Sequence, residues 1–313
     1  MEASDLVKDS ELETKFFDDH LRHIFYRRGT NATDRRIRLS EKWVRNRQLG
    51  SGSFGTVWLE TCKKTVRQGT PTTRAVKEIK VHPRVDITRE LEAIAKFSNN
   101  KFEPCFVRSY GWFRGPESIF ITMEYILHGD LRHHLRKLLP ESEVKTISQQ
   151  LLEGLKHMFD NRFVHRDLKP ENILVVAKGP HWLVQISDFG ISKRLQEGGT
   201  IQGTMRQGTL GFMAPELLGF VAEKRFPFAV DMWSLGAVAF RMFTGKQYLA
   251  DYDEMREFVQ GNRPFPSEEL LGGGISEAGL DFIQKLLLAD PGSRMTPDTA
   301  GAHEWHTELN RRS

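Results

Sequence analysis

The chain has 313 residues, of which 39% are hydrophobic and 27% are charged, so it has the composition of a folded globular protein and not of a disordered or collagen-like one. Its longest apolar stretch, around residues 235–240, ends at Arg241 and is far shorter than the ~20 residues of a transmembrane helix. The acidic start shows no apolar segment typical of a signal peptide. Two cysteines, Cys62 and Cys105, do not by themselves make a disulfide framework or a zinc site, so we expect an intracellular location, cytoplasmic or nuclear.

The formal net charge of +4 is unevenly distributed. Residues 1–20 carry seven acidic and two basic side chains, whereas residues 21–47 carry nine basic and two acidic ones. We interpret residues 1–42 as an N-terminal extension whose charges partly neutralise each other. A nucleic-acid or membrane adaptor role is the alternative, but no interleaved aromatic residues support it. Helical spacing of apolar residues within residues 15–28 predicts a short amphipathic helix that packs on a neighbouring lobe.

From Trp43 onward, the pattern predicts a strand-rich part followed by a helix-rich part. The expected strands lie at residues 57–59, 74–79, 106–113 and 119–124, and one helix is expected at residues 87–97. The expected helices of the second part lie at residues 131–139, 143–159, 229–243, 280–288 and 296–302. This order predicts an α+β protein with two lobes, and a ligand site in the cleft between them.

A glycine-rich segment opens the first part. Gly50, Gly52 and Gly55 form a Gly-x-Gly-x-x-Gly pattern, and the residues that follow favour a strand, so the loop joins two antiparallel strands. Glycines allow the backbone to approach phosphate oxygens, although a plain glycine-rich hairpin explains this pattern alone equally well. Lys77 closes the next strand, and Glu90 stands near the start of the predicted helix.

The richest polar cluster is His-Arg-Asp-Leu-Lys-Pro-Glu-Asn at residues 165–172, between two apolar runs. Burying so many polar groups is costly unless they have a role. Ser-Asp-Phe-Gly follows at residues 187–190, then Ala-Pro-Glu at 214–216, and Asp-Met-Trp-Ser-Leu-Gly at 231–236. Together with the glycine-rich loop and Lys77, these motifs occur in one fixed order.

In these motifs the sequence resembles the eukaryotic protein kinase family, Ser/Thr-directed branch, over about residues 43–305. The resemblance implies a bilobal kinase domain at residues 43–308, with an antiparallel-sheet N-lobe at 43–125 that has one main helix, and a mostly helical C-lobe at 127–308. It also implies ATP- and Mg²⁺-dependent transfer of the γ-phosphoryl group to Ser or Thr hydroxyls of protein substrates. Lys169 is the residue that favours the Ser/Thr branch.

The resemblance also implies roles for individual residues. Asp167 would accept the proton of the substrate hydroxyl, and Lys169 would steady the γ-phosphoryl group. Asn172 and Asp188 would hold Mg²⁺. Lys77, paired with Glu90, would hold the α- and β-phosphates. The implied nucleotide-binding residues are Leu49, Gly50, Gly52, Ser53, Phe54, Gly55, Val57, Ala75, Lys77, Met123, Glu124, Ile126, Asp130 and Leu174.

Other matched residues would be structural, and some positions depart from the family pattern. Glu216 and Arg294 would form a buried ion pair, and Asp231 would bind the backbone of residues 165–167. Lys77 and Glu90 are only 13 residues apart, which predicts that the helix carrying Glu90 is short at its start. Ser109 replaces an apolar residue of the column that links the lobes, which the resemblance implies contains Ile94, His165 and Phe189.

Two features concern specificity and regulation. Arg241 stands where the family has an acid that attracts basic substrate residues, while Asp130 and Glu171 remain available to a basic residue one step further away. Arg166 and Lys193 resemble a phosphate pocket, so we expect Thr204, or secondly Thr200, to be phosphorylated by an upstream kinase or by the chain itself. A pseudokinase scaffold is the alternative function, but Lys77, Asp167 and Asp188 are all retained.

Overall fold

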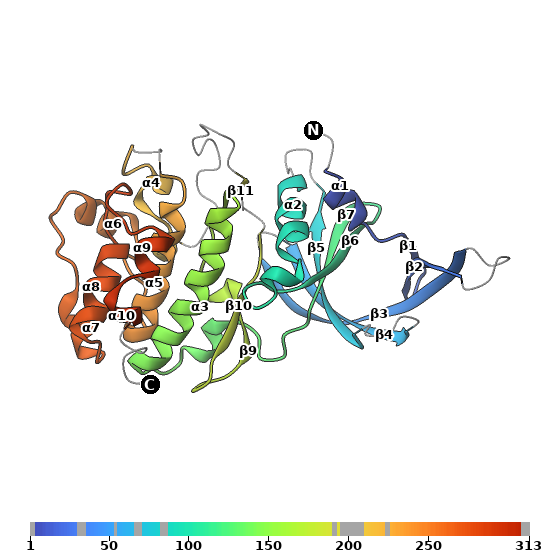
Figure 1. The fold of residues 1–313 in the computed structure, drawn as a ribbon, viewed down its shortest axis with the longest axis horizontal. Helices are drawn as coiled ribbons and strands as arrows, with labels where there is room; N and C mark the ends of the chain where they lie inside the picture. Colours follow the sequence, from blue (N-terminus) through green and yellow to red (C-terminus); the bar gives the residue numbers. More distant parts are fainter. Residues whose placement is uncertain are drawn as a thin grey trace. The chain divides into compact units, whose positions relative to one another are not determined.

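The computed structural model describes residues 4–29, 36–52, 55–65, 71–81, 87–189, 193–194, 210–222 and 226–307. The chain forms two compact units (Figure 1). One contains Met1–Glu103 and Val107–Tyr125, and the other contains Pro104–Phe106 and Ile126–Ser313. We call them the sheet unit and the helical unit. The predicted α+β fold is confirmed.

The sheet unit is built on seven antiparallel strands in the order β1-β2-β3-β4-β5-β7-β6. The strands are β1 (Thr14–Phe16), β2 (Leu21–Arg28), β3 (Arg36–Gly52), β4 (Gly55–Lys64), β5 (Thr73–Lys80), β6 (Ser109–Arg114) and β7 (Ser118–Met123). Its helices are α1 (Asp5–Asp9), α2 (Thr88–Phe97) and the 3₁₀ turn η1 (Asn100–Phe102). The start of α2 at Thr88 confirms the predicted short helix.

The sheet contributes residues to an apolar cluster on each face, because consecutive strand residues point to opposite sides. Trp112 belongs to one apolar cluster and Phe113 to the other. The first cluster lies against α2 and comprises Val7, Ile79, Leu91, Trp112, Ile119 and Ile121. The second comprises Leu21, Trp43, Val76, Phe113 and Phe120. Residues from before Trp43 therefore complete both clusters.

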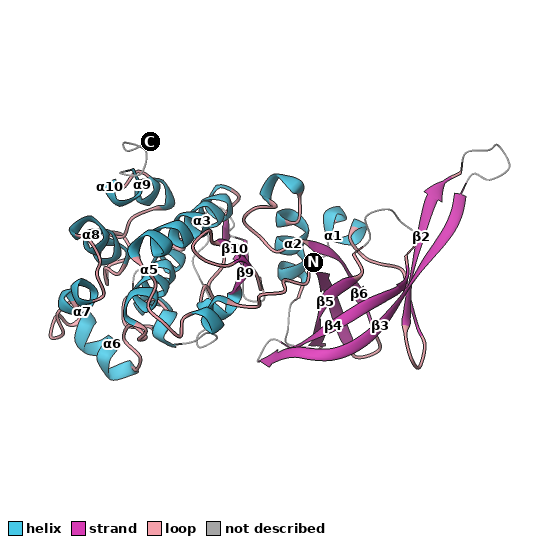
Figure 2. Cartoon of the chain, turned by 90° about the horizontal axis from the view of Figure 1, so that it is seen from below, coloured by secondary structure: helices cyan, strands magenta, loops and turns pink. Residues whose placement is uncertain are grey.

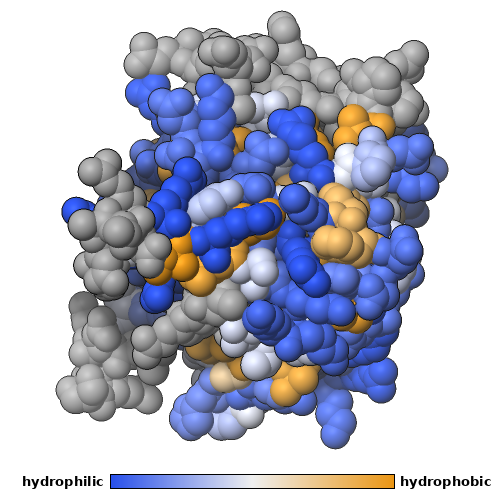
Figure 3. Space-filling model, turned by 90° about the vertical axis from the view of Figure 1, so that its right-hand side faces the viewer, coloured by the Kyte–Doolittle hydropathy of each residue, from blue (hydrophilic) through white to orange (hydrophobic). Residues whose placement is uncertain are grey.

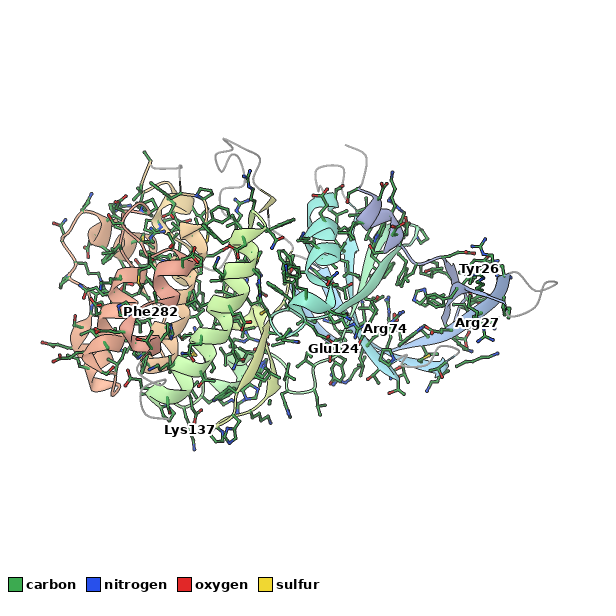
Figure 4. All side chains as sticks on the ribbon, viewed as in Figure 1. Tyr26, Arg27, Arg74, Glu124, Lys137 and Phe282 are labelled. Atoms are coloured by element: carbon green, nitrogen blue, oxygen red, sulfur yellow. The ribbon has the colours of Figure 1, made fainter. Side chains whose placement is uncertain are left out.

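The prediction of a helix at residues 15–28 is wrong, since this segment forms β1 and β2. β2 pairs along its whole length with the first half of β3, from Leu21 opposite Trp43 to Arg28 opposite Arg36. Figure 2 shows these two strands projecting beyond the rest of the sheet, and Figure 4 places Tyr26 and Arg27 on the projecting part and Arg74 within the sheet. The helical spacing of the apolar residues gave a wrong prediction, because pairing with residues 36–43 decides the structure of this segment.

The helical unit contains most of the helices. They are α3 (Glu141–Asp160), α4 (Pro215–Leu218), α5 (Ala229–Thr244), α6 (Tyr252–Val259), α7 (Ser267–Gly272), α8 (Glu277–Leu286), α9 (Pro297–Gly301) and α10 (Glu304–Thr307). The 3₁₀ turns are η2 (Leu131–His134), η3 (Pro170–Asn172) and η4 (Leu210–Phe212). The short strands are β8 (Phe163–Val164), β9 (Ile173–Ala177), β10 (Leu183–Ile186) and β11 (Lys193–Arg194).

The core of this unit is formed around α5, whose residues are buried on nearly every side. A helix that is apolar all round is typical of a protein interior. Its C-terminus is closed by Gly245 in the left-handed conformation. α3 contacts α5, and it buries Val144, Ile147, Leu151 and Leu155 at helical spacing.

Two further predicted elements are shorter than expected. The helix predicted at residues 131–139 is only the turn η2, because the Leu139 N–H bonds to the Met242 carbonyl and the chain leaves the helical path. The strand predicted from Phe106 begins at Ser109, since Phe106 pairs instead with Ile186 of the helical unit. Non-local bonds therefore set both boundaries.

Among the described residues, none of the helices combines the length and hydropathy needed to cross a bilayer. The face seen in Figure 3 is mainly hydrophilic, with short hydrophobic bands between the polar side chains.

His306 makes folding stability sensitive to acid. Its ring is buried against Phe282 and Trp305. Burial, with Lys145 and His303 nearby, lowers the pKa of His306 to about 4 from 6.5. The unfolded chain therefore takes up a proton that the folded chain resists, so stability falls as the pH drops from 6.5 towards 4.

We predict that His306→Gln reduces this loss. Between pH 7 and pH 5 the Tm of the variant should fall by roughly 2–4 °C less than that of the wild type. Differential scanning calorimetry at both pH values measures the difference, with the exposed His181→Gln as control. Parallel Tm profiles for wild type and His306→Gln would show that another group is responsible.

Candidate active site

The polar cluster at residues 165–172 lies between β8 and β9 of the helical unit, and its central carboxylate is fixed by two neighbours. Asp167 Oδ2 accepts a hydrogen bond from Lys169 Nζ at 2.7 Å and from Asn172 Nδ2 at 3.0 Å. Asn172 Nδ2 also donates to the Asp167 carbonyl at 2.7 Å. Burial raises the pKa of Asp167, and Lys169 opposes that rise. The Asp167 carboxylate is therefore a base with a fixed orientation, and it stays close to the Lys169 ammonium group.

Asp231 at the start of α5 binds the backbone of the segment that precedes Asp167. Its two carboxylate oxygens each accept a backbone N–H, from His165 and from Arg166, both at 2.7 Å. Burial raises the pKa of Asp231, and these two bonds and the nearby Arg166 side chain favour its charged form. Arg166 has φ +71°, a conformation that L-residues rarely adopt. The bond from its N–H to Asp231 stabilises that strained backbone.

Asp188 follows β10 and also has a left-handed backbone, with φ +61°. The residue before it, Ser187, donates its N–H to the Asn172 carbonyl at 2.9 Å, and the His165 ring bonds to the Ser187 carbonyl at 3.0 Å. These bonds connect the segments that carry Asp167, Asn172 and Asp188. Next to Asp188, the Phe189 ring contacts the rings of His165 and Phe106.

The oxygen atoms of this site fit a hard divalent cation. Asn172 uses its amide nitrogen to bond Asp167, so its side-chain oxygen is the atom left for a metal. Asp188 supplies a carboxylate. Mg²⁺ prefers one or two such oxygens together with water and substrate phosphates. The donor set is therefore suited to the Mg²⁺ that the sequence predicts.

In the sheet unit, Lys77 and Glu90 form a buried ion pair, with Lys77 Nζ 2.7 Å from Glu90 Oε1. Lys77 lies on β5 opposite Val57 of β4 and Ile121 of β7, and Ala75 lies opposite Met123. Neither charge is tolerated in this environment without its partner, so the pair requires α2 to lie close to β5.

The glycine-rich loop connects β3 and β4. Gly50 and Gly52 are exposed, and a Cβ at either position would meet no atom within 4 Å. Gly55 has φ +124°, and a Cβ there would lie 2.1 Å from the Glu78 carbonyl oxygen, so only glycine fits. Ser53 and Phe54 lie outside the described residues. The half-buried Leu49 stands just before the loop.

The segment after β7 offers backbone groups of the kind that bind an adenine edge. The Glu124 N–H donates to the Arg108 carbonyl, and the Ile126 carbonyl accepts from Gly129. Among the described residues, the Glu124 carbonyl and the Ile126 N–H have no backbone partner outside regular elements. Figure 4 marks Glu124 on this segment. Leu174 of β9 forms a bridge with Asp130 in the helical unit.

Two acidic side chains expected to be available to a basic substrate residue are already engaged. Asp130 Oδ1 accepts from the His133 backbone N–H and contacts its ring at 2.8 Å. Arg132 Nε lies 3.6 Å from Glu171 Oε1 and 4.0 Å from Asp130 Oδ1. Arg132 was not among the residues predicted from the sequence. Its position two residues after Asp130 was the only signal, because Glu171 approaches it from 39 residues away.

The predicted structural ion pair between Glu216 and Arg294 is confirmed. Arg294 Nη1 and Nη2 donate to the two Glu216 oxygens at 2.6 and 2.8 Å. The remaining donors of the guanidinium bond to the carbonyls of Leu288, Ala229 and Ala289. All five N–H groups of Arg294 are satisfied, as a buried guanidinium requires.

Comparison with known proteins agrees with these features. Residues 43–306 match the protein kinase domain model. The chain is 33% identical over 274 residues to the serine/threonine-protein kinase RAD53 of Saccharomyces cerevisiae, which covers 82% of this chain and 32% of that protein. It is 32% identical over 272 residues to the serine/threonine-protein kinase cds1 of Schizosaccharomyces pombe, covering 83% and 57%.

A third relative is calcium/calmodulin-dependent protein kinase type 1 of Caenorhabditis briggsae, 29% identical over 289 residues that cover 90% of this chain and 77% of that protein. The chain thus spans about a third of RAD53 and somewhat more than half of cds1.

Proposed function

Because the chain belongs to the protein kinase family, on its serine/threonine branch, we propose that it transfers the γ-phosphoryl group of ATP to Ser or Thr hydroxyls of protein substrates in the presence of Mg²⁺. The observation that carries this proposal is the Asp167 carboxylate, held by Lys169 and Asn172 above a backbone anchored to Asp231. This arrangement concentrates buried charge around one carboxylate, which lowers the free energy of unfolding. We infer that the chain keeps it because it serves chemistry.

In this proposal Asp167 orients the acceptor hydroxyl and takes its proton as the bond to phosphorus forms. The described bonds to its carboxylate go to Oδ2, so Oδ1 is the oxygen for the hydroxyl. Lys169 lies within reach of both the carboxylate and a transferred phosphoryl group, and its charge offsets charge on each. Positioning and electrostatics supply most of the acceleration.

Nucleotide binding is assigned to the remaining polar groups. Lys77, fixed by Glu90, binds the α- and β-phosphates, and the backbone of the glycine-rich loop covers them. Asn172 and Asp188 hold Mg²⁺, which neutralises phosphate charge when bound. The adenine ring contacts Leu49, Val57, Ala75 and Leu174, and Met123 limits the depth of its pocket. Asp130, already bonded to His133, binds the ribose or a substrate side chain.

The direct test is phosphate transfer from radiolabelled ATP to a generic protein substrate, with a thermal-shift titration of ATP and Mg²⁺ in parallel. Transfer supports the kinase proposal. Nucleotide binding without transfer would favour a scaffold role instead.

We predict that Asp167→Asn lowers kcat by several hundredfold or more, while ATP affinity stays near that of the wild type, because this group acts on the acceptor hydroxyl. Asp188→Asn should instead weaken Mg²⁺-dependent nucleotide binding. The exposed Asp253→Asn is the matched control and should leave both quantities unchanged. Steady-state kinetics and nucleotide titration measure them, and near-normal turnover of Asp167→Asn would contradict its assigned role.

Substrate choice should depend on Arg241 of α5. Its Nε is buried and makes no hydrogen bond among the described residues, and Arg132 already pairs with the two nearby acids. Asp130 and Glu171 therefore offer little free negative charge to a substrate arginine. We infer a weak preference for arginine just before the phosphorylated residue.

Arg241→Glu should raise the preference for arginine at that position by a measurable factor, since it replaces repulsion by attraction. Arrays of degenerate peptides measure the profile of each protein. Arg241→Gln tests removal of charge alone, and Arg256→Glu on the exposed face of α6 is the control. Identical profiles for Arg241→Glu and wild type would refute the inference.

We also propose activation by phosphorylation at Thr204, or secondly Thr200, through an upstream kinase or self-phosphorylation. Both threonines and the Lys193 side chain lie outside the described residues, while Arg166 is buried beside Asp167. A phosphate of about −2 charge would pair with these cations and order the segment.

Intact-mass analysis with activity measurements, before and after phosphatase treatment, should show that activity falls with the lost phosphate. Full activity of a phosphate-free Thr200→Ala/Thr204→Ala variant would exclude this switch.

A further inference from the structure

The N-terminal segment, residues 4–12, contacts the helix that carries Glu90. Val7 of α1 is 1% exposed and belongs to the same apolar cluster as Leu91 of α2 and Trp112 of β6. Ile94 of α2 packs against this cluster as well. α1 and α2 are in contact, and both figures of the fold show them together (Figures 1 and 2).

Hydrogen bonds attach this segment to β6. The Trp112 indole N–H donates to the Val7 carbonyl at 2.9 Å, and the Trp112 backbone N–H donates to Ser10 at 3.1 Å. Leu12 donates its N–H to the Trp112 carbonyl at 2.7 Å. Gly111 has φ +114°, and a Cβ there would lie 2.6 Å from the Ser10 carbonyl oxygen. β6 therefore has a surface shaped to receive this segment.

α2 needs such support because it is short. It has ten residues, Glu90 is the third, and no side chain caps its N-terminus. A helix of this length is marginal in isolation, so packing must fix its position. Its C-terminal end is attached to β6, where Ser98 Oγ accepts the Ser109 N–H at 3.2 Å. Val7 packs near the other end, beside Leu91.

We propose that the N-terminal segment is a positioning element of the active site, in which Val7 holds α2 so that Glu90 stays paired with Lys77. The inference rests on the proposed kinase function for its effect on activity. Of the nucleotide-binding residues assigned above, Met123 packs against the apolar cluster that contains Val7. Its neighbours are solvated, with Leu6 50% exposed and the Asp5 side chain 97% exposed. One buried side chain thus links this segment to α2.

The test compares Val7→Asp with Leu6→Asp in the full chain. A charge at Val7 cannot stay in the apolar cluster, so the segment should leave and kcat/KM should fall at least about tenfold. Leu6→Asp places the same charge one residue away on the exposed side and should keep wild-type kinetics. Val7→Ile should also keep them.

A double-mutant cycle with Glu90→Gln separates positioning from general stability. If Val7 acts through Glu90, Val7→Asp should lower kcat/KM in the wild type but have little further effect in the Glu90→Gln background. An equal loss in both backgrounds, or none in the wild type, would overturn the proposal.

Two readouts do not depend on catalysis. A fluorescent peptide of residues 4–13 should bind the Val7→Asp protein in a polarisation assay, whereas the same peptide carrying Val7→Asp should not. Amide hydrogen exchange in α2 should be faster in Val7→Asp than in Leu6→Asp, and the wild-type peptide should slow it. Unchanged α2 exchange would overturn the inference. If the wild-type protein transfers no phosphate, the proposed function fails, while these two readouts still decide whether the segment holds α2.

Discussion

The carboxylate of Asp231 is the interaction on which the helical unit's polar cluster depends. It lies in α5, whose residues are buried on nearly every side, so an unpaired charge there would be costly, and it binds two consecutive backbone N–H groups. Through these bonds, the central helix of the core fixes the backbone on which Asp167 stands. The stability of the core and the geometry of the candidate site are therefore coupled through one side chain.

The same principle applies to the other buried charges. Lys77 requires Glu90, and Arg294 requires Glu216 and three carbonyls, so each charge ties together elements distant in sequence. The two pairs differ in their surroundings. Arg294 is enclosed by bonds to the chain itself, whereas the Lys77–Glu90 pair depends on the position of a ten-residue helix.

The sequence predicted what depends on local patterns and recognisable motifs, and it failed where distant pairing decides. The fixed spacing of their motifs singled out Asp167, Asn172 and Asp188, and hydrogen bonds connect the segments that carry them. Their roles stay predictions. The strands of residues 15–28 were not predicted, since their structure depends on residues 36–43. The interactions of Arg132 and Val7 were equally hidden, because each depends on side chains that only the fold brings near. Contacts of this kind leave no periodic signal in the sequence.

The projecting pair of β2 and β3 affects the association of one copy of the chain with another. β1 pairs only with residues 21–23 of β2, so among the described residues the outer edge of β2 beyond Ile24 has no strand beside it. An open edge of this kind invites pairing with another chain. Here the edge strand carries the exposed Arg27 and Arg28. Two such edges repel each other, and because salt screens exposed charges over about 8 Å at physiological strength, this protection against aggregation weakens as ionic strength rises.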